Sequence, residues 1–218
     1  MSAKKKSEPD LTTENQRLRE MLQAREAELS VLNSVQDALV SNLEVDSIFE
    51  IVGDRLADIF SGHTVALYTF DKEADLLRPL YLLERGERLH PNPIQPGPIG
   101  IQLLETKQAL MLSSREDYEA IGSQTVEGTA TSLSGIYAPM IVQDRVIGGL
   151  NIENVDYENA FNEADLRLVT TITNSMSVAL ENARLFDRTQ QLLEETEARN
   201  AELAIINTVQ QALASELD

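Results

Sequence analysis

The sequence contains no cysteine and no tryptophan. Without cysteine the chain can form neither disulfides nor thiolate metal sites, and it offers no thiol as a nucleophile or as the attachment point of a bilin. A covalent bilin and a disulfide are therefore excluded. The absence also fits a reducing compartment, so we expect a cytoplasmic protein.

Basic residues and long apolar runs are scarce as well. Lysine and arginine together number 18 against 36 acidic residues, a net charge of −18. A surface of this sign repels nucleic acid and anionic lipid, so neither is an expected partner. No uncharged apolar stretch reaches the ~18 residues needed for a membrane span. The first ten residues, MSAKKKSEPD, have no apolar core behind their lysines, so residues 1–10 are expected to be a disordered lead rather than a secretory signal.

Both ends of the chain carry versions of one segment. AELSVLNSVQDALVSNLE, from Ala27 to Glu44, matches AELAIINTVQQALASELD, from Ala201 to Asp218, in ten of eighteen pairs. A second pair, ENQRL and ENARL, begins at Glu14 and Glu181. The two offsets, 174 and 167, differ by one heptad, which leaves an apolar stripe on the same side of a helix. We interpret the chain as one period of a longer tandem array; two ordinary amphipathic helices are the alternative.

A seven-residue frame places apolar residues on one stripe of each end segment. Polar residues interrupt both stripes in the same order, as Asn15, Arg25 and Gln36 and again as Asn182, Arg199 and Gln210. The pattern predicts signalling helices over residues 11–45 and 181–218 that pair as coiled coils in a parallel homodimer. The predicted interface consists of Leu18, Leu22, Leu29, Leu32 and Leu39, and of Leu185, Leu192, Leu203, Ile206 and Leu213.

Residues 46–180 change pattern and predict a separate domain. A helix follows Asp46, and strands are expected over 65–70, 76–84, 109–113, 134–142 and 145–153, the last two joined by a two-residue turn. A short helix is expected over 100–106, an irregular polar segment over 115–131, and a long helix from Glu163, capped by Asn162. This order predicts an α+β fold, an antiparallel sheet with helices against a face.

Three segments resemble the GAF domain family: GPIGIQLLETKQALMLSS, APMIVQDRVIGGLNIEN and AFNEADLRLVTTITNSMSVALENARLF. The resemblance runs from about Val31 to Phe186. It implies a GAF/PAS-like six-stranded antiparallel sheet, with helices packed on one face and a ligand pocket on the other. It also implies a sensory module of a tandem-GAF, bacterial-type signalling protein, with a downstream output domain such as a nucleotide cyclase or a histidine kinase.

The resemblance makes a cyclic nucleotide one candidate ligand, and the cofactor is otherwise unknown. Of the family's Asn-Lys…Phe…Asp-Glu signature, Asn154, Phe161 and Asp165 match, whereas Val155 and Leu166 replace the lysine and the glutamate. The free amides at the start of the short helix, at Ile99, Gly100 and Ile101, suit an anion. A plain connector is the alternative interpretation of this proline-rich stretch.

Other candidate ligand-binding residues come from the strands and from the end of the polar segment. Asn151 alternates with Leu150 and Ile152, so it faces away from the helices if these two face them. A solvated amide is the alternative for Asn151, and core packing is the alternative for the tyrosines. The full predicted set is Tyr68, Leu83, Ile99, Gly100, Thr131, Ser132, Tyr137 and Asn151.

Catalysis and metal binding have little support in the sequence. The two histidines, His63 and His90, stand in no acid–base or metal-ligand spacing. The methionine sulfoxide reductases of GAF type require cysteines. Two hypotheses remain: a sensor whose pocket binds a small molecule, and a ligand-free dimerisation and relay domain whose pocket is filled by Tyr68, Leu83 and Tyr137.

Overall fold

The computed structural model describes residues 45–215, with side chains as far as residue 206, and helical positions at 14–16, 18–19, 21–22, 25–26, 29–30 and 33. Its centre is one six-stranded antiparallel sheet in the order β3-β2-β1-β6-β5-β4. The strands are β1 (Thr64–Asp71), β2 (Leu76–Glu84), β3 (Glu87–Arg88), β4 (Leu110–Leu112), β5 (Ser134–Val142) and β6 (Arg145–Asn154). The predicted α+β fold and its sheet are confirmed, and β3 is an addition of two residues.

Tight turns fix the order of the strands. Gln143 and Asp144, the predicted two-residue connection between β5 and β6, both have positive φ values, of 47° and 64°. This is the pattern of a type I′ turn, whose twist matches that of a β-hairpin. Strands β5 and β6 therefore form the predicted tight hairpin, with Val142 opposite Arg145.

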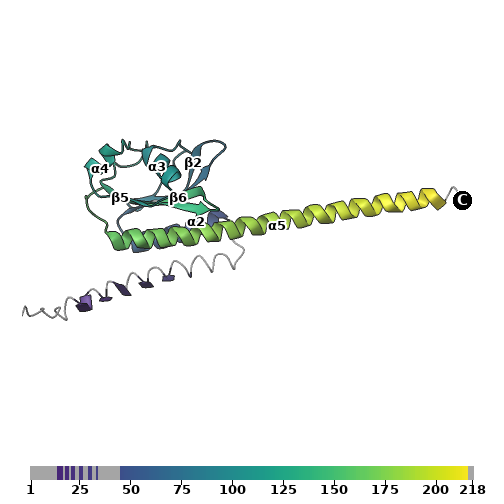
Figure 1. Ribbon diagram of the computed structural model, residues 1–218, viewed down its shortest axis with the longest axis horizontal. Coiled ribbons are helices and arrows are strands. Elements are labelled where there is room, and N and C mark those ends of the chain that lie inside the picture. Colours follow the sequence, from purple (N-terminus) through teal and green to yellow (C-terminus); the bar gives the residue numbers. More distant parts are fainter. Residues whose placement is uncertain are drawn as a thin grey trace, which may run out of the picture.

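Two helices cover one face of the sheet, as Figure 1 shows: α2 (Val45–Ile59) and the start of α5 (Glu163–Ser215). The apolar stripe of α2 is fully buried, and so is the facing stripe of α5. Together with the inward residues of β1, β5 and β6 these stripes form the main hydrophobic core. The N-terminus of α5 is capped as predicted: Asn162 Oδ1 accepts from the amides of Ala164 and Asp165, and Asp165 Oδ2 accepts from the Asn162 amide.

Two short helices lie on the opposite side of the sheet, α3 (Pro98–Thr106) and α4 (Arg115–Ala120) (Figure 1). The prediction of an irregular segment from residue 115 is wrong for α4. Ser114 Oγ accepts from the Asp117 amide while Asp117 Oδ2 accepts from the Ser114 amide, a capping box that stabilises the first turn. Tyr118 then anchors the helix by its burial.

Helix α5 continues well beyond the sheet as a single helix of 53 residues (Figure 1). Leu185, Leu192, Leu203 and Ile206, all predicted interface residues, are exposed on it by 54%, 46%, 56% and 44%. Leu18, Leu22 and Leu29 are likewise helical and exposed. Leu32 and Leu39 lie outside the described residues, and Leu213 lies in α5 with its side chain outside the described part. Coiled-coil pairing of these residues stays a prediction.

Candidate functional site

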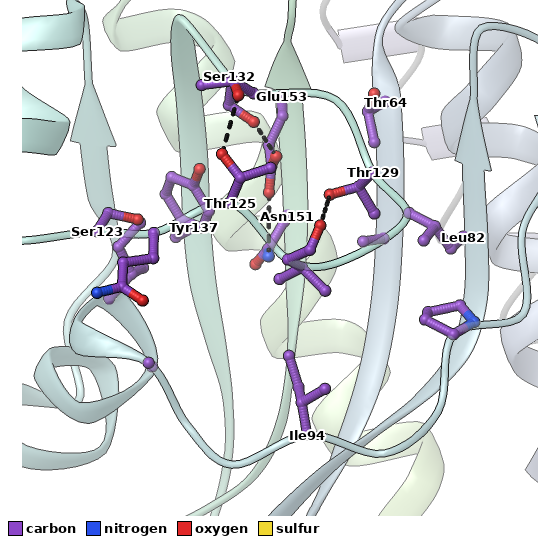
Figure 2. Close-up of a pocket in the computed structure, with 18 of the residues that line it drawn as sticks. Thr64, Leu82, Ile94, Ser123, Thr125, Thr129, Ser132, Tyr137, Asn151 and Glu153 are labelled. Carbon is purple, nitrogen blue, oxygen red and sulfur yellow. Dashed lines mark hydrogen bonds between the residues drawn. The ribbon is translucent and has the colours of Figure 1, made fainter.

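A cavity of about 490 Å³ lies on the sheet face that α2 and α5 leave free. Strands β1, β2, β5 and β6 form its floor, and its walls come from the start of α3, from α4 and from the segment that follows α4. A volume of this size fits a small organic molecule, for which pockets of ~300–1,000 Å³ are usual. Figure 2 shows polar side chains gathered over β5 and β6, with Leu82 to their right and Ile94 below them.

Seven of the eight residues predicted to bind a ligand line this cavity. Ile99 and Gly100 belong to α3, and Thr131 and Ser132 to the segment before β5. Tyr68, Tyr137 and Asn151 belong to β1, β5 and β6. The structure thus brings together residues from five separate stretches of sequence. Contact of each with a ligand stays a prediction.

Leu83 does not line the cavity; it packs against the main core. The nearby Tyr81, which is 1% exposed, shows which side of the sheet these residues of β2 point to, because its ring packs against helix α2 at Gly53. Leu83 is two residues from Tyr81 on the same strand and therefore points the same way. Leu82 and Glu84, which alternate with them, face the cavity instead.

Glu153 lies at the centre of the polar floor. Its Oε2 accepts a short hydrogen bond from Ser132 Oγ, and its Oε1 accepts from Asn151 Nδ2 at 3.4 Å (Figure 2). Burial raises the pKa of the Glu153 carboxyl, and the Glu84 carboxylate raises it further, whereas the bonds from Ser132, Asn151 and Tyr137 act in the opposite direction. The net shift is upward, so the site holds a carboxyl that is costly to ionise.

Two tyrosines close the side of the cavity under α4. The hydroxyls of Tyr118 and Tyr137 lie 2.7 Å apart, and the rings meet edge to face with centroids 6.3 Å apart. Burial and the charge of Glu153 raise the pKa of both phenols, so both stay neutral. With Leu103 and Leu112 they form a second, smaller apolar cluster that supports this wall.

The start of α3 borders the apolar end of the cavity. Gly97 is the N-cap and Pro98 carries no amide hydrogen, so the amides without a helical acceptor are those of Ile99 and Gly100. The expectation that the Ile101 amide is also free is wrong, because it donates to Gly97 O at 2.9 Å. Leu77 and Pro96 lie next to Gly100, so the surroundings of this helix start are apolar.

The segment between α4 and β5 crosses above the polar floor and is held by side-chain contacts. The hydroxyls of Thr125 and Thr131 lie 2.9 Å apart, and Thr129 Oγ1 donates to Val126 O at 2.9 Å. Both carboxylate oxygens of Glu84 accept from the Ala130 amide at 3.1 Å. Together with the bond from Ser132 to Glu153, these contacts connect the segment to strands β2 and β6.

The residues that match the family signature lie outside the cavity. Asn154 Oδ1 accepts from the amides of Asp156 and Tyr157, and its Nδ2 contacts His63 Nδ1 at 3.0 Å. Phe161 is 8% exposed and packs against the His63 ring, and Asp165 caps α5. In this chain these residues stabilise the turn after β6 and the start of α5.

Sequence reasoning missed three polar residues of the floor: Thr64, Glu84 and Glu153. Glu153 was within reach, since it is two residues from Asn151 on one strand and shares its face. To predict that Glu84 and Thr64 line the cavity, one must know which face of β2 and of β1 packs against the helices. The packing of Tyr81 against α2 determines this. Among the described residues, no group of His, Asp and Glu side chains is placed to hold a metal ion, and no helix is long and apolar enough to cross a membrane.

Comparison with known proteins agrees with this architecture. The family model described as GAF domain matches residues 42–181. No curated protein matches the chain. Three similar solved structures are free methionine-R-sulfoxide reductase from Neisseria meningitidis in complex with its substrate, residues 122 to 287 of a methyl-accepting chemotaxis protein, and the phycoerythrobilin-bound GAF domain from a cyanobacterial phytochrome.

The likeness to these three structures concerns the fold. The reductase has a TM-score of 0.62 at 18% identity, over 85% of this chain and 99% of its own. The chemotaxis protein has a TM-score of 0.60 at 16% identity, over 72% of this chain and 98% of its own. The phytochrome domain has a TM-score of 0.58 at 17% identity, over 73% of this chain and 97% of its own. The substrate of the reductase and the bilin of the phytochrome domain are ligands of those proteins.

Proposed function

Because the chain belongs to the GAF domain family, a family of sensory and regulatory modules in signalling proteins, we propose that it is the sensory module of a signal-transduction protein. A small molecule bound in the cavity would alter the pairing of the long helices, and these would relay the change to an output domain such as a cyclase or a kinase. The proposed role is non-catalytic and cytoplasmic.

The observation that carries the proposal is the cavity of about 490 Å³ with both a polar and an apolar end. The alternative, a ligand-free relay domain, requires this space to be filled by Tyr68, Leu83 and Tyr137. Leu83 belongs to the opposite face, and both tyrosines are parts of the cavity wall. The sensor hypothesis is therefore preferred.

Strands β5 and β6 offer a route from the cavity to α5. Tyr137 and Asn151 face the cavity from β5 and β6. On the same two strands, the Ile141 amide donates to Ser177 Oγ of α5 at 3.0 Å, and Gln143 at the hairpin turn donates to Glu181 at 3.3 Å. A ligand that shifts these strands would act directly on α5. A preference of about 1–3 kcal/mol between two helix pairings is within the usual range of such coupling.

The proposed partner is a second copy of this chain. The exposed stripe of α5 carries four apolar residues at heptad positions beyond the sheet: Leu185, Leu192, Leu203 and Ile206. Burial of each would contribute about 1.5–3 kcal/mol, which the ordering of side chains partly offsets. Pairing in parallel would bring the two output domains together.

A thermal-shift screen of small molecules, with cyclic nucleotides included, tests the sensor function. A ligand at 100 times its dissociation constant stabilises the folded state by about 2.7 kcal/mol. The matched control is Ala66→Leu, which extends a side chain from β1 into the cavity. A ligand of the cavity should stabilise the wild type and lose its effect in the variant. An absence of any hit in a broad screen would favour the relay hypothesis.

A further inference from the structure

At the polar end of the cavity, three neighbouring strands place a threonine between two glutamates, one on each side. Thr64 on β1 pairs with Glu153 on β6, and Val65 pairs with Leu83, which brings Glu84 of β2 to the other side of Thr64. All three side chains line the cavity. The two carboxylates also hold the same short segment, through the Ala130 amide and Ser132 Oγ.

No positive charge in the cavity balances these carboxylates. Arg115 is the one cationic residue among those that line it. Its side chain is 67% exposed, and its Nε lies 3.4 Å from Glu119 Oε1. In the described part of the chain, no ion pair involves Glu84 or Glu153. The electrostatic field inside the polar end therefore favours a cation over an anion.

Hydrogen-bond acceptors also exceed donors at this end. The Oγ1 of Thr64, a residue only 5% exposed, and the Oδ1 of Asn151 have no partner among the described residues. A carboxylate has about four acceptor positions. Glu84 receives one backbone amide, and Glu153 receives the hydroxyls of Ser132 and Tyr137 and a long bond from Asn151. A ligand that supplies several N–H donors would satisfy groups that the protein leaves unpaired.

The other end of the cavity is apolar. Leu77 and Pro79 of β2 face it from the sheet, Ile94 faces it from the segment between β3 and α3, and Ile99 faces it from α3. Figure 2 shows Ile94 on the side of the opening away from Glu153. A ligand that spans both ends has one donor-rich group and one apolar body.

We propose that the cavity binds a small organic cation, an ammonium or amidinium group on an apolar body, with the cationic group between Glu84 and Glu153. The inference rests on the proposed sensory function and names its ligand class. Each N–H of the cation donates to a carboxylate, to the amide oxygen of Asn151 or to the hydroxyl of Thr64. Charge-assisted bonds of this kind are the stronger class of hydrogen bond.

Three compounds of one shape test the charge preference: benzamidine, benzamide and benzoate. Each is titrated into the complete chain, isotope-labelled, while the amide signals of Ala66, Asn151 and Ser132 are followed by NMR. Benzamidine should move these signals with an affinity at least about tenfold higher than that of benzamide, and benzoate should be weaker still.

Variants locate the cationic group. Glu153→Gln keeps the shape and removes the charge, and it should weaken benzamidine binding by about tenfold while leaving benzamide within about twofold. Glu84→Gln should act in the same direction. The matched control is Glu119→Gln, at the mouth of the cavity and already next to Arg115, which should change benzamidine binding by less than about twofold.

The outcomes separate this inference from the function on which it rests. Benzoate or benzamide binding as well as benzamidine at these signals would overturn the preference for a cation and leave a small-molecule pocket in place. Equal benzamidine affinity in wild type and in Glu153→Gln would also overturn it. No response of the cavity amides to any of the three would count against both the inference and the sensory cavity.

Discussion

The ring of Tyr81 on β2 occupies the space that a side chain at Gly53 of α2 would need. A β-carbon at residue 53 would come within 2.2 Å of Tyr81 Cδ2. The Tyr81 hydroxyl donates to Asp54 at 3.0 Å, and the guanidinium carbon of Arg88 lies over the ring, 3.7 Å from its centroid. These contacts fix helix against sheet, and they determine which face of β2 reaches the cavity.

Gly53→Ala should destabilise the protein although alanine is the better helix former. The helix preference favours alanine by about 1 kcal/mol. The overlap with a fully buried ring costs about 1–3 kcal/mol and should prevail, because the hydrogen bond to Asp54 and the contact with Arg88 hold the ring in place. We expect a lower midpoint in urea unfolding at unchanged slope.

Gly97→Ser is the matched control for that variant. Its β-carbon would meet no atom within 4 Å, and its φ of −74° suits any residue. Serine is also favoured at an N-cap, so stability should stay within about 0.5 kcal/mol of the wild type. An alanine at residue 53 that is as well tolerated as this serine would contradict the packing.

The periodicity of the sequence was sufficient to predict the sheet, its hairpins and the direction of Asn151. Alternation and turn residues are local signals, and the β5–β6 pair shows both, with one register shift between Met140 and Ile141. Helix α4 was missed because its residues are polar, yet the Ser114–Asp117 capping box was a readable signal.

The polar floor of the cavity could be predicted only in part. The face of Leu83 depends on Tyr81 meeting α2, and these residues are far apart in the sequence. A register shift between Leu67 and Tyr68 adds a further irregularity to the β1–β2 pair. Glu153 is charged, and a charged residue in a strand is usually exposed to solvent, so its enclosure could not be read from residue type.

The two adjacent glycines of β6 should respond differently to alanine. A β-carbon at Gly148 would lie 2.2 Å from the backbone oxygen of Tyr68, whereas one at Gly149 would lie 2.3 Å from the Tyr68 hydroxyl. A side chain can rotate away, but a paired backbone cannot move without breaking the β1–β6 ladder. Gly148→Ala should therefore cost the larger share of the ~1–3 kcal/mol typical of overpacking.

Chemical denaturation of both glycine variants, with NMR signals of the cavity as a second readout, checks this order. Gly149→Ala should keep most of its stability while it displaces Tyr68 and shifts the signals of cavity residues. A larger loss of stability for Gly149→Ala than for Gly148→Ala would contradict the proposed difference.

The pH dependence of stability should reveal the enclosed Glu153. Its folded pKa lies above the ordinary value of 4.5, so between the two values the folded state binds more protons than the unfolded state. Stability must then fall as pH rises from 4.5 through the folded pKa. Glu153→Gln should remove this fall, so the variant should gain stability relative to the wild type as pH rises from 4.5, and the difference should vanish below 4.5.

The groups that face Glu153 decide how cleanly this titration is seen. Tyr137, Tyr118 and Tyr68 all have raised pKa values and stay neutral throughout the window. Glu84 is the other acid at this end of the cavity, so the measurement is repeated in Glu84→Gln. A stability difference between wild type and Glu153→Gln that does not change with pH would contradict an enclosed carboxyl.

The exposed end of α5 should mediate self-association through one stripe only. Leu192 and Ile206 lie on the predicted stripe, while their neighbours Leu193 and Ile205 lie beside it, and the neighbours are the more exposed, at 59% and 66%. Leu192→Lys with Ile206→Lys should yield a monomer in sedimentation analysis, because each lysine would bring its charge into an apolar seam. Leu193→Lys with Ile205→Lys adds the same charge to the same two turns and should remain dimeric.

Since the chain has no cysteine, a single Leu192→Cys should also crosslink to its copy under mild oxidation if the two helices run parallel and in register, whereas Leu193→Cys should crosslink far less. Equal behaviour of the two lysine pairs would show that association, if present, does not use this stripe.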